Sequence, residues 1–381
     1  MYGLLCVDWQ QGALFDSVQR RGLSSCDWSP ACARVVCSGG YPHEDSACER
    51  VLPGRHFLAI GFLSSPGIAA DKLIGIHSAR TMSQSMPWIA DEVGLFKKYD
   101  LEFQLVFISS AAMVTAAMLS GDGEVAITGA ESITRAFAQG VTELIFIASA
   151  KNTLTHSILG KAEIKRPEDL KGKKLGLTRL GSNSHYFVIQ ALRKYGMEPT
   201  EVNFIQTSGQ TENLAALFSG AVDAATMTGP SGGARAISQG FRYVVYGPDL
   251  HIPFAAATLV ARRSSIRTRG PVIERFVRVM AEAVKIMFTD KELTYKVLAK
   301  QLRISDRKVL DAAYDEEIKV MEPRLEFKTE AFQAILDETA KVDPRAKKIK
   351  PQDLIDRRYI DGLEKNGFFD KLWAGNKPTP P

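Results

Sequence analysis

Cysteine is missing from most of this chain. All five cysteines lie within the first 48 of the 381 residues, and no two of them form a Cys-x-x-Cys pair. A body without cysteine is compatible with an oxidising compartment. A zinc site near the N-terminus, with His43 as the neighbouring ligand, remains the less favoured alternative. We therefore expect neither a metal nor a cofactor.

Other absences narrow the function further. The net charge is only +5, and Lys and Arg are interleaved with Asp and Glu, so there is no basic stripe for a nucleic acid. No apolar run approaches the roughly 20 residues that cross a bilayer. No cysteine nucleophile follows residue 48, and no two histidines have metal-ligand spacing. We expect no nucleic-acid partner and no catalysis.

An internal repeat is the most informative feature that is present. Residues 116–126 recur in similar form as residues 215–225, and each copy leads to a Thr-Gly pair, Thr128-Gly129 and Thr228-Gly229. Both copies predict a helix end, a glycine stop, a short buried strand and a turn into another helix. A duplicated α/β unit indicates two similar lobes with a cleft between them. The alternative is a chance match between two alanine-rich helix ends.

An export signal is predicted at residues 51–70. A basic residue, an apolar core of about seven residues, a breaker and small residues follow one another here, which is typical of a secretory signal peptide. Cleavage after Ala70 would leave Asp71 as the mature N-terminus. Residues 1–50 precede this signal, so we expect translation to begin near Val51. A genuine extension on a cytosolic protein is the alternative.

From residue 71 onward, strand and helix patterns alternate, which predicts an α/β protein with a mainly parallel sheet. The predicted strands are 73–77, 101–107, 124–128, 144–149, 173–178, 202–206, 223–227, 243–246 and 256–261. The predicted helices are 86–93, 111–120, 132–139, 182–195, 212–219, 275–287, 294–301, 306–320 and 329–339.

The simplest architecture has two lobes. We expect residues 71–152 and 254–381 to form the first lobe, with the helical tail packed on it, and residues 153–253 to form the second. Two crossovers between lobes make a hinge that can close over a ligand.

Ligands in open α/β sheets bind beyond the carboxyl ends of the strands. Four strand-to-helix junctions therefore carry the candidate site, because helix-start N–H groups and glycines suit an anion or a carbonyl. The Ser and Asn side chains there are equally suited to capping helices. With the crossovers included, the predicted ligand-binding residues are Ser78, Arg80, Ser83, Gly129, Ala130, Glu131, Asn152, Thr153, Gly181, Ser182, Asn183, Ser184, Thr228, Gly229, Pro230 and His251.

These segments have a family resemblance. Residues 73–368 resemble the solute-binding proteins of ABC importers of the nitrate/sulfonate/taurine and thiamine-pyrimidine-precursor group. The matching stretches are residues 94–98, 148–153, 166–176, 179–182 and the repeat. Asp100 departs from the pattern, because such chains commonly have a glycine there.

The resemblance implies a bilobal type II periplasmic-binding-protein fold. It also implies a monomeric periplasmic protein that captures a small anionic or polar organic solute and delivers it to an ABC permease in the inner membrane. Ser78, Gly129, Asn152, Ser182, Asn183 and Thr228 would line the site by this resemblance.

Two other functions are alternatives to solute binding. A related branch is an enzyme that makes the thiamine pyrimidine with pyridoxal phosphate, but that branch carries a cysteine-rich motif which this body lacks. A ligand-sensing effector domain would need a DNA-binding helix-turn-helix, and the first seventy residues show no such helical pattern.

Overall fold

The computed structural model describes residues 70–375, apart from the side chains of Pro230 and Ser231. The predicted leader, residues 1–50, and all of the predicted signal except Ala70 lie outside the described residues. Ten strands in this part of the chain form two five-stranded sheets.

The first sheet has the strand order β2-β1-β3-β10-β4. It is built from β1 (Asp71–His77), β2 (Leu101–Phe107), β3 (Val125–Thr128), β4 (Leu144–Leu154) and β10 (Ile252–Arg262). Strand β1 pairs in parallel with β2 and β3, whereas β10 runs antiparallel to β3 and β4. The sheet is therefore mixed, and the prediction of a mainly parallel sheet is wrong, because β10 runs antiparallel to both of its neighbours.

The second sheet repeats this arrangement with the order β7-β6-β8-β5-β9. Its strands are β5 (His156–Gly160), β6 (Lys174–Leu177), β7 (Asn203–Gln206), β8 (Ala224–Thr228) and β9 (Arg242–Val245). Strand β6 is parallel to β7 and β8, and β5 is antiparallel to β8 and β9. Strands β3 and β8, which follow the two copies of the repeat, thus occupy the same central position in their sheets.

Helices follow the strands in both halves. The first sheet carries α1 (Met86–Glu92), α2 (Leu95–Lys98), α3 (Ala111–Ser120) and α4 (Glu131–Ala138), and the second carries α5 (Asn183–Lys194), α6 (Gln210–Phe218) and α7 (Pro230–Ser238). Gly121 and Gly220 stop α3 and α6 with φ of 98° and 75°, in the left-handed region that glycine occupies without strain. The repeat therefore encodes one helix–turn–strand unit twice.

The tail consists of α8 (Arg263–Thr289), α9 (Lys291–Leu302), α10 (Arg307–Ile318), α11 (Thr329–Val342), α12 (Arg358–Lys365) and α13 (Phe368–Leu372). Helix α8 is longer than predicted and bends at Arg269, two residues before Pro271. It packs on α1, as expected for a tail on the first lobe. Helix α10 packs both on η1 (Met82–Gln84) of the first lobe and on α7, a contact with the second sheet that the sequence did not predict.

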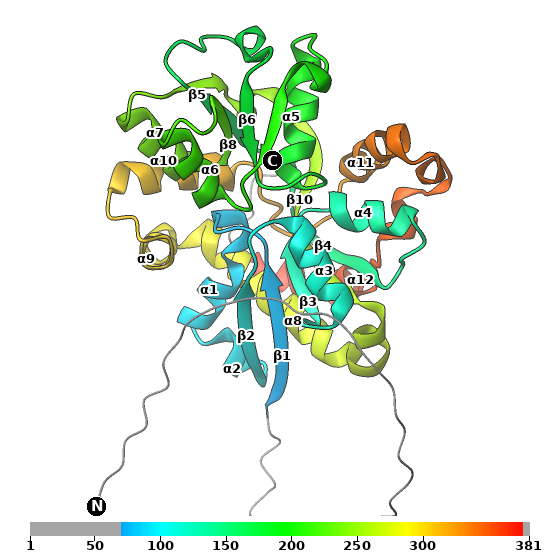
Figure 1. The fold of residues 1–381 in the computed structure, drawn as a ribbon. Helices are drawn as coiled ribbons and strands as arrows, with labels where there is room; N and C mark the ends of the chain where they lie inside the picture. Colours follow the sequence, from blue (N-terminus) through cyan, green and yellow to red (C-terminus); the bar gives the residue numbers. More distant parts are fainter. Residues whose placement is uncertain (1–69, 376–381) are drawn as a thin grey trace, which may run out of the picture. The chain divides into compact units, whose positions relative to one another are not determined.

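The chain passes between the sheets twice, from β4 to β5 at Thr155 and from His251 into β10 (Figure 1). Strand β4 extends to Leu154, beyond the predicted end at Ser149, because its continuation pairs with the start of β10. We retain the predicted lobe boundaries as a proposal, with these crossovers as the hinge.

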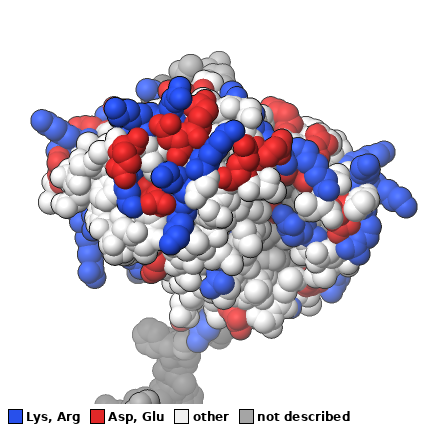
Figure 2. All heavy atoms as spheres, turned by 45° about the horizontal axis from the view of Figure 1, so that its top comes forward, with Lys and Arg blue, Asp and Glu red and all other residues white. Residues whose placement is uncertain are grey.

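No helix among residues 70–375 is long and apolar enough to cross a membrane. Basic and acidic side chains are intermixed on the charged part of the surface that Figure 2 presents.

Candidate functional site

A cavity lies where the two sheets face each other. Its volume is about 50 Å³, room for roughly three to five water molecules. Residues from both sheets, from the loops and helix starts that follow their strands, from the β4–β5 crossover and from α10 line it: Ser78, Ala79, Thr81, Ser83, Gln84, Ser109, Ser110, Ala111, Lys151, Leu154, Thr155, His156, Thr178, Ser182, Asn183, Ser184, Gln210, Thr228, Ala256 and Glu317. Thirteen of these twenty residues carry a hydroxyl or a side-chain amide, which suits a small polar solute.

The first wall is organised by Gln84. Its Oε1 accepts hydrogen bonds from the backbone N–H groups of Ser78 and Ala79 at 3.0 and 2.9 Å, and its Nε2 donates to Ser78 Oγ at 3.0 Å. All three residues follow β1 directly or belong to the short helix η1 (Met82–Gln84). The end of β1 is therefore held in one shape by a buried side chain.

The second wall has an equivalent arrangement after β6. The N–H of Thr178 donates to Ser184 Oγ at 3.0 Å, and the Thr178 hydroxyl lies 2.9 Å from those of Ser182 and Ser184. Ser182 Oγ also donates to the carbonyl of Arg179 at 2.7 Å. These hydroxyls thus form a connected cluster at the start of α5, where helix N–H groups favour anions.

Two serines mark corresponding loops with unusual backbone angles. Ser110, before α3, has φ of 90°, and Ser208, before α6, has φ of 76°. Each N–H donates to the carbonyl of the residue that follows the corresponding strand of its sheet, Ser78 after β1 or Thr178 after β6. Strained non-glycine residues of this kind are concentrated at binding sites. Ser110 is 5% exposed and lines the cavity.

A buried ion pair closes one side of the cavity. Lys151 on β4 bonds through Nζ to Glu317 Oε1 on α10 and, at 2.6 Å, to Thr155 Oγ1. Thr155 in turn donates to Glu317 Oε1 at 2.8 Å. Although burial alone would raise it, the Lys151 charge and the nearby hydroxyls hold the pKa of Glu317 below its ordinary value. The pair brings no net charge to the cavity.

His156 also lines the cavity, stacked on Phe187 with ring centroids 5.6 Å apart. Burial, together with the charge of Lys151, lowers its pKa to about 3. The imidazole is therefore neutral at physiological pH and offers a polar edge without charge.

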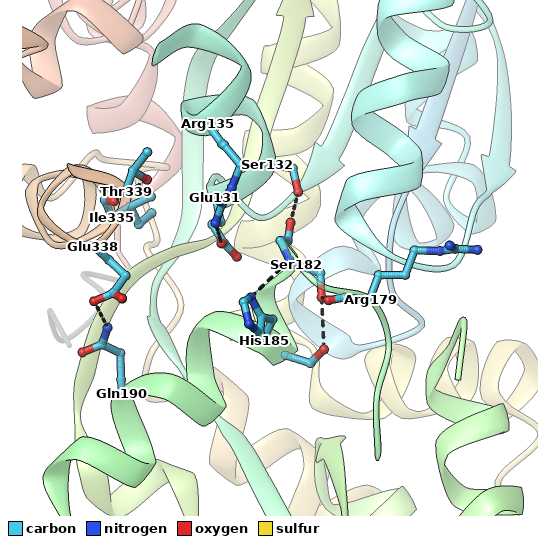
Figure 3. A network of polar contacts seen from close by, with 12 residues as sticks. Glu131, Ser132, Arg135, Arg179, Ser182, His185, Gln190, Ile335, Glu338 and Thr339 are labelled. Atoms are coloured by element: carbon cyan, nitrogen blue, oxygen red, sulfur yellow. Dashed lines mark hydrogen bonds and ion pairs between the residues drawn. The ribbon is translucent and has the colours of Figure 1, made fainter. Parts of the chain in front are cut away.

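Helices α4 and α5 meet through polar contacts of Glu131, Ser132, Arg135, Gly181 and His185, which we call the seam (Figure 3). Ser132 Oγ donates to the carbonyl of Gly181, and Gly181 N–H donates to His185 Nδ1 at 3.1 Å. Arg135 pairs with Glu131 at 2.8 Å within α4. Burial raises the pKa of Glu131 to about 7 despite this pair. The seam joins an element of the first sheet to one of the second.

Six of the sequence-predicted residues line the cavity: Ser78, Ser83, Ser182, Asn183, Ser184 and Thr228. Arg80 lines an adjoining outer cavity of about 530 Å³ instead, where its guanidinium lies 4.6 Å from the centre of the Phe107 ring. The outer cavity forms the mouth of the inner one. The two cavities share five lining residues: Ser78, Ala79, Ser109, Gln210 and Thr228.

The structure places the other predicted residues outside the inner cavity. Gly129, Ala130, Glu131 and Gly181 belong to the seam or its flank, and Gly229 and Pro230 begin α7. Gly129 is nevertheless next to the site, because a Cβ there would lie 2.0 Å from Asn183 Oδ1.

The three predicted residues at the crossovers lie outside the inner cavity. Asn152 Nδ2 donates to Glu322 Oε1 at 3.1 Å and to the carbonyl of Glu326 at 2.9 Å, which ties β4 to the tail. Thr153 pairs with Pro253 across the hinge strands. His251 is exposed, with φ of 46°, after the short helix η4 (Gly247–Leu250). None of the three lines the cavity.

Sequence reasoning missed Lys151, Thr155 and Glu317. Lys151 lies in a buried strand. Its position within an apolar run is the sequence signal that could have identified it as a site residue. Glu317 lies on a helix with many exposed charges, and its burial depends on packing that the local pattern does not contain.

Two mixed sheets of the same strand order, joined by two crossovers around a polar cavity, define the bilobal type II periplasmic-binding-protein fold. The alkanesulfonate-binding protein SsuA from Xanthomonas axonopodis pv. citri, solved with MOPS bound, has this fold with a TM-score of 0.64, 17% identity and coverage of 76% of this chain and 98% of its own. The desulfurization enzyme DSZB matches with a TM-score of 0.60, 13% identity and coverage of 78% and 99%.

The sequence comparisons identify the family. The NMT1/THI5 like family model matches residues 85–292, and the chain belongs to this family. The taurine-binding periplasmic protein of Escherichia coli (strain K12) is 28% identical over 122 residues, which are 32% of this chain and 38% of that protein. The match thus spans well under half the length of this relative.

Proposed function

We propose that this protein is the periplasmic solute-binding component of an ABC importer. It captures a small anionic or polar organic solute, a sulfonate-, nitrate- or taurine-like acid or a pyrimidine precursor, and delivers it to the permease as a monomer. The observation that carries this proposal is the small cavity lined by hydroxyl and amide groups from two facing sheets. Family membership and the periplasmic relative support the same role.

The lining suits binding by neutral donors. Ser184 and Thr178 offer hydroxyls beside the start of α5, and Ser182, whose own proton goes to the Arg179 carbonyl, holds them in place. Ser110 adds another hydroxyl from the first wall. Oxygen atoms of an acid accept hydrogen bonds from such groups without a neutralising cation. Each wall contributes separately, so the solute gains its full set of contacts only when the two lobes are together.

Catalysis is the competing class. Residues 229–233 match the Gly-x-Ser-x-Gly pattern of a serine-hydrolase elbow, between β8 and α7. The same residues are an ordinary helix start with proline in the first turn. A hydrolase also needs a histidine and an acid within reach of the serine. The histidine in the cavity, His156, is stacked on Phe187 instead, so we favour binding.

A thermal-shift screen of the full chain tests the proposal. The probes are alkanesulfonates, nitrate, pyrimidines and aromatic carboxylates. A solute at about a hundred times its dissociation constant should stabilise the native state by about 2.7 kcal/mol. An absorbance scan of the purified protein checks for a Schiff-base chromophore, which would favour the enzyme.

Asn183→Ala should reduce the shift while leaving the unliganded melting temperature nearly unchanged. Ser182→Ala should reduce the shift and also lower that temperature somewhat, because it removes the buried hydrogen bond to the Arg179 carbonyl. Ser219→Ala is the matched control, because this exposed serine bonds only to the carbonyl of Ala216 in its own helix. If no small molecule shifts the wild type, the binding role is wrong. If the Ser182 and Asn183 variants unfold instead, these residues cap the helix rather than bind.

A further inference from the structure

The outer cavity, which forms the mouth of the inner one, is rich in positive charge. Three arginines line it, one from each part of the chain around it: Arg80 after β1, Arg235 on α7 and Arg303 at the end of α9. Among its lining residues within the described range 70–375, Glu212 is the single acidic one. The whole chain, by contrast, has 48 Lys and Arg for 43 Asp and Glu. Positive charge is therefore concentrated at the mouth.

The three guanidinium groups are not neutralised by a neighbour. In the described part of the chain, none of them forms an ion pair with a carboxylate within 4.0 Å. Lys300, which lines an adjoining cavity together with Arg80 and Arg303, is instead paired with Glu92 at 3.2 Å. Arg80 lies over the Phe107 ring, a contact that leaves its charge intact. All three arginine side chains are exposed, so their charges act on whatever enters the mouth.

The inner cavity has no comparable charge. Lys151 is neutralised by Glu317, and burial lowers the pKa of His156 to about 3, so its imidazole is neutral. None of the three arginines lines this cavity. Their charges still reach beyond the mouth, because the screening length is about 8 Å at physiological ionic strength and about 30 Å at 0.01 M salt. Charges on the rim of a site act mainly on the rate of association.

We infer that the outer cavity is an encounter site for anions, and that Arg80, Arg235 and Arg303 speed the capture of the solute by attracting its charge. This inference rests on the proposed function and concerns the anions among its solutes. The arginines determine specificity through the rate, because an anion is drawn into the mouth and an uncharged molecule is not. A cleft lined by charges of one sign raises association rates by about 10- to 1,000-fold, and the gain falls steeply with ionic strength.

Stopped-flow mixing of the full chain with ethanesulfonate, benzoate and nitrate tests the inference. Tryptophan fluorescence is the signal, because Trp88 lines the cavity that adjoins the mouth. The test variant combines Arg80→Gln, Arg235→Gln and Arg303→Gln. For the anions that bind, its association rate constant should be about tenfold below that of wild type at 0.01 M salt and nearly equal to it at 0.5 M. The dissociation rate constant should change by less than about twofold.

Two further variants separate the charge at the mouth from other effects. Three exposed cations that line neither the inner cavity, the outer cavity nor the one beside Trp88 are replaced by glutamine in the matched control: Arg242, Arg267 and Lys347. This control loses the same net charge and should associate at nearly the wild-type rate. Lysine at the three mouth positions keeps the charge without the planar guanidinium fork and should restore the rate. All substitutions are at exposed side chains, so the melting temperatures should match that of wild type.

The possible outcomes are distinct. The inference is overturned, and the proposed function stands, if the glutamine variant associates as fast as the control. The same holds if its loss persists at 0.5 M salt or in the lysine variant, because the arginines would then hold the solute by direct contact. Binding of uncharged pyrimidines alone would also overturn the inference, since no anion is captured. If no small molecule of the thermal-shift screen binds, the proposed function itself fails.

Discussion

Glycine follows threonine at the end of both β3 and β8, and the two glycines are needed for different reasons. Gly229 has φ of 70°, which a side chain would strain. Gly129 does not have a positive φ, but Asn183 occupies the space where its Cβ would be. The first copy of the repeat therefore ends at a close contact between lobes, and the second ends at a turn.

Gly129→Ala should weaken solute binding much more than it weakens the fold. The added methyl group would lie 2.0 Å from Asn183 Oδ1, so the Asn183 side chain must rotate from its place in the cavity wall. We expect roughly a tenfold loss of affinity, as when one good hydrogen bond is removed from a buried site. Titration calorimetry measures the affinity, and the melting temperature without solute reports the fold.

Gly362→Ala is the control for this substitution. Gly362 lies in α12 with no atom within 4 Å of an added Cβ, so alanine there should leave binding unchanged and favour the helix slightly. Wild-type affinity in Gly129→Ala would show that Asn183 does not contribute to binding.

At the residue scale, serines and Asn183 at the α5 start were predictable, because short polar side chains follow a strand at a glycine. Asp100 stands where related chains commonly have glycine. Its φ of 50° lies in the left-handed region, which explains the preference for glycine at this position. Glu317 was not predictable, since its neighbours Asp315 and Glu316 give it the appearance of a solvated helix face.

At the element scale, the seam between α4 and α5 is a contact between the two lobes that the repeat does not encode. Its polar groups come from both lobes, and α11 adds Glu338, which accepts a hydrogen bond from Gln190 at 2.9 Å. Buried polar groups of this kind fix one relative position of two elements because few other positions satisfy them.

The stability of the protein should depend on the protonation of Glu131 in this seam. Burial raises its pKa from 4.5 to about 7, and the charge of Glu338 acts in the same direction against that of Arg135. A raised folded-state pKa gives stability that is present below about pH 4.5 and is lost as the pH rises to about 7. Glu131→Gln should therefore gain stability relative to wild type across this window, on the order of 3 kcal/mol.

Denaturant unfolding of both proteins from pH 4 to 8 measures the difference. The titration of His156, which is shared by the two proteins, cancels in it. If the difference in unfolding free energy between Glu131→Gln and wild type stays constant, or reverses as the pH rises, Arg135 keeps Glu131 charged in the folded protein.

Elements with a clear period and clear ends were predictable from sequence. Helix α3 and strand β2 occur at the predicted residues, because a glycine stop bounds the helix and alternation bounds the strand. Strand β5 was missed, since its five buried residues show no alternation and include Ser157 and Gly160, which are more typical of turns. The start of α8 was missed because Gly270 and Pro271 interrupt its pattern.

At the scale of the whole molecule, the repeat predicted two similar lobes, and the structure has two sheets with equivalent strand orders. The repeat did not predict that the helical tail contacts both sheets. Helix α10 packs on α7 of the second sheet while its Glu317 bonds to Lys151 of the first. A contact between elements so far apart in sequence depends on the packed fold and leaves no local pattern.

Calorimetric titration of a blocked cavity tests the central claim, that a solute binds between the two sheets. Ala79 lines both the inner cavity and its mouth. Its hydrogen bonds use only its backbone, the N–H to Gln84 and the carbonyl to His77, so Ala79→Leu fills the entrance without removing a contact. Ala221→Leu, at an exposed turn before β8, is the matched control. With the solute that gives the largest thermal shift, we predict one site per chain in wild type and Ala221→Leu, and at least about a tenfold weaker affinity in Ala79→Leu. Wild-type affinity in a folded Ala79→Leu variant would contradict the account, because the solute would then bind elsewhere.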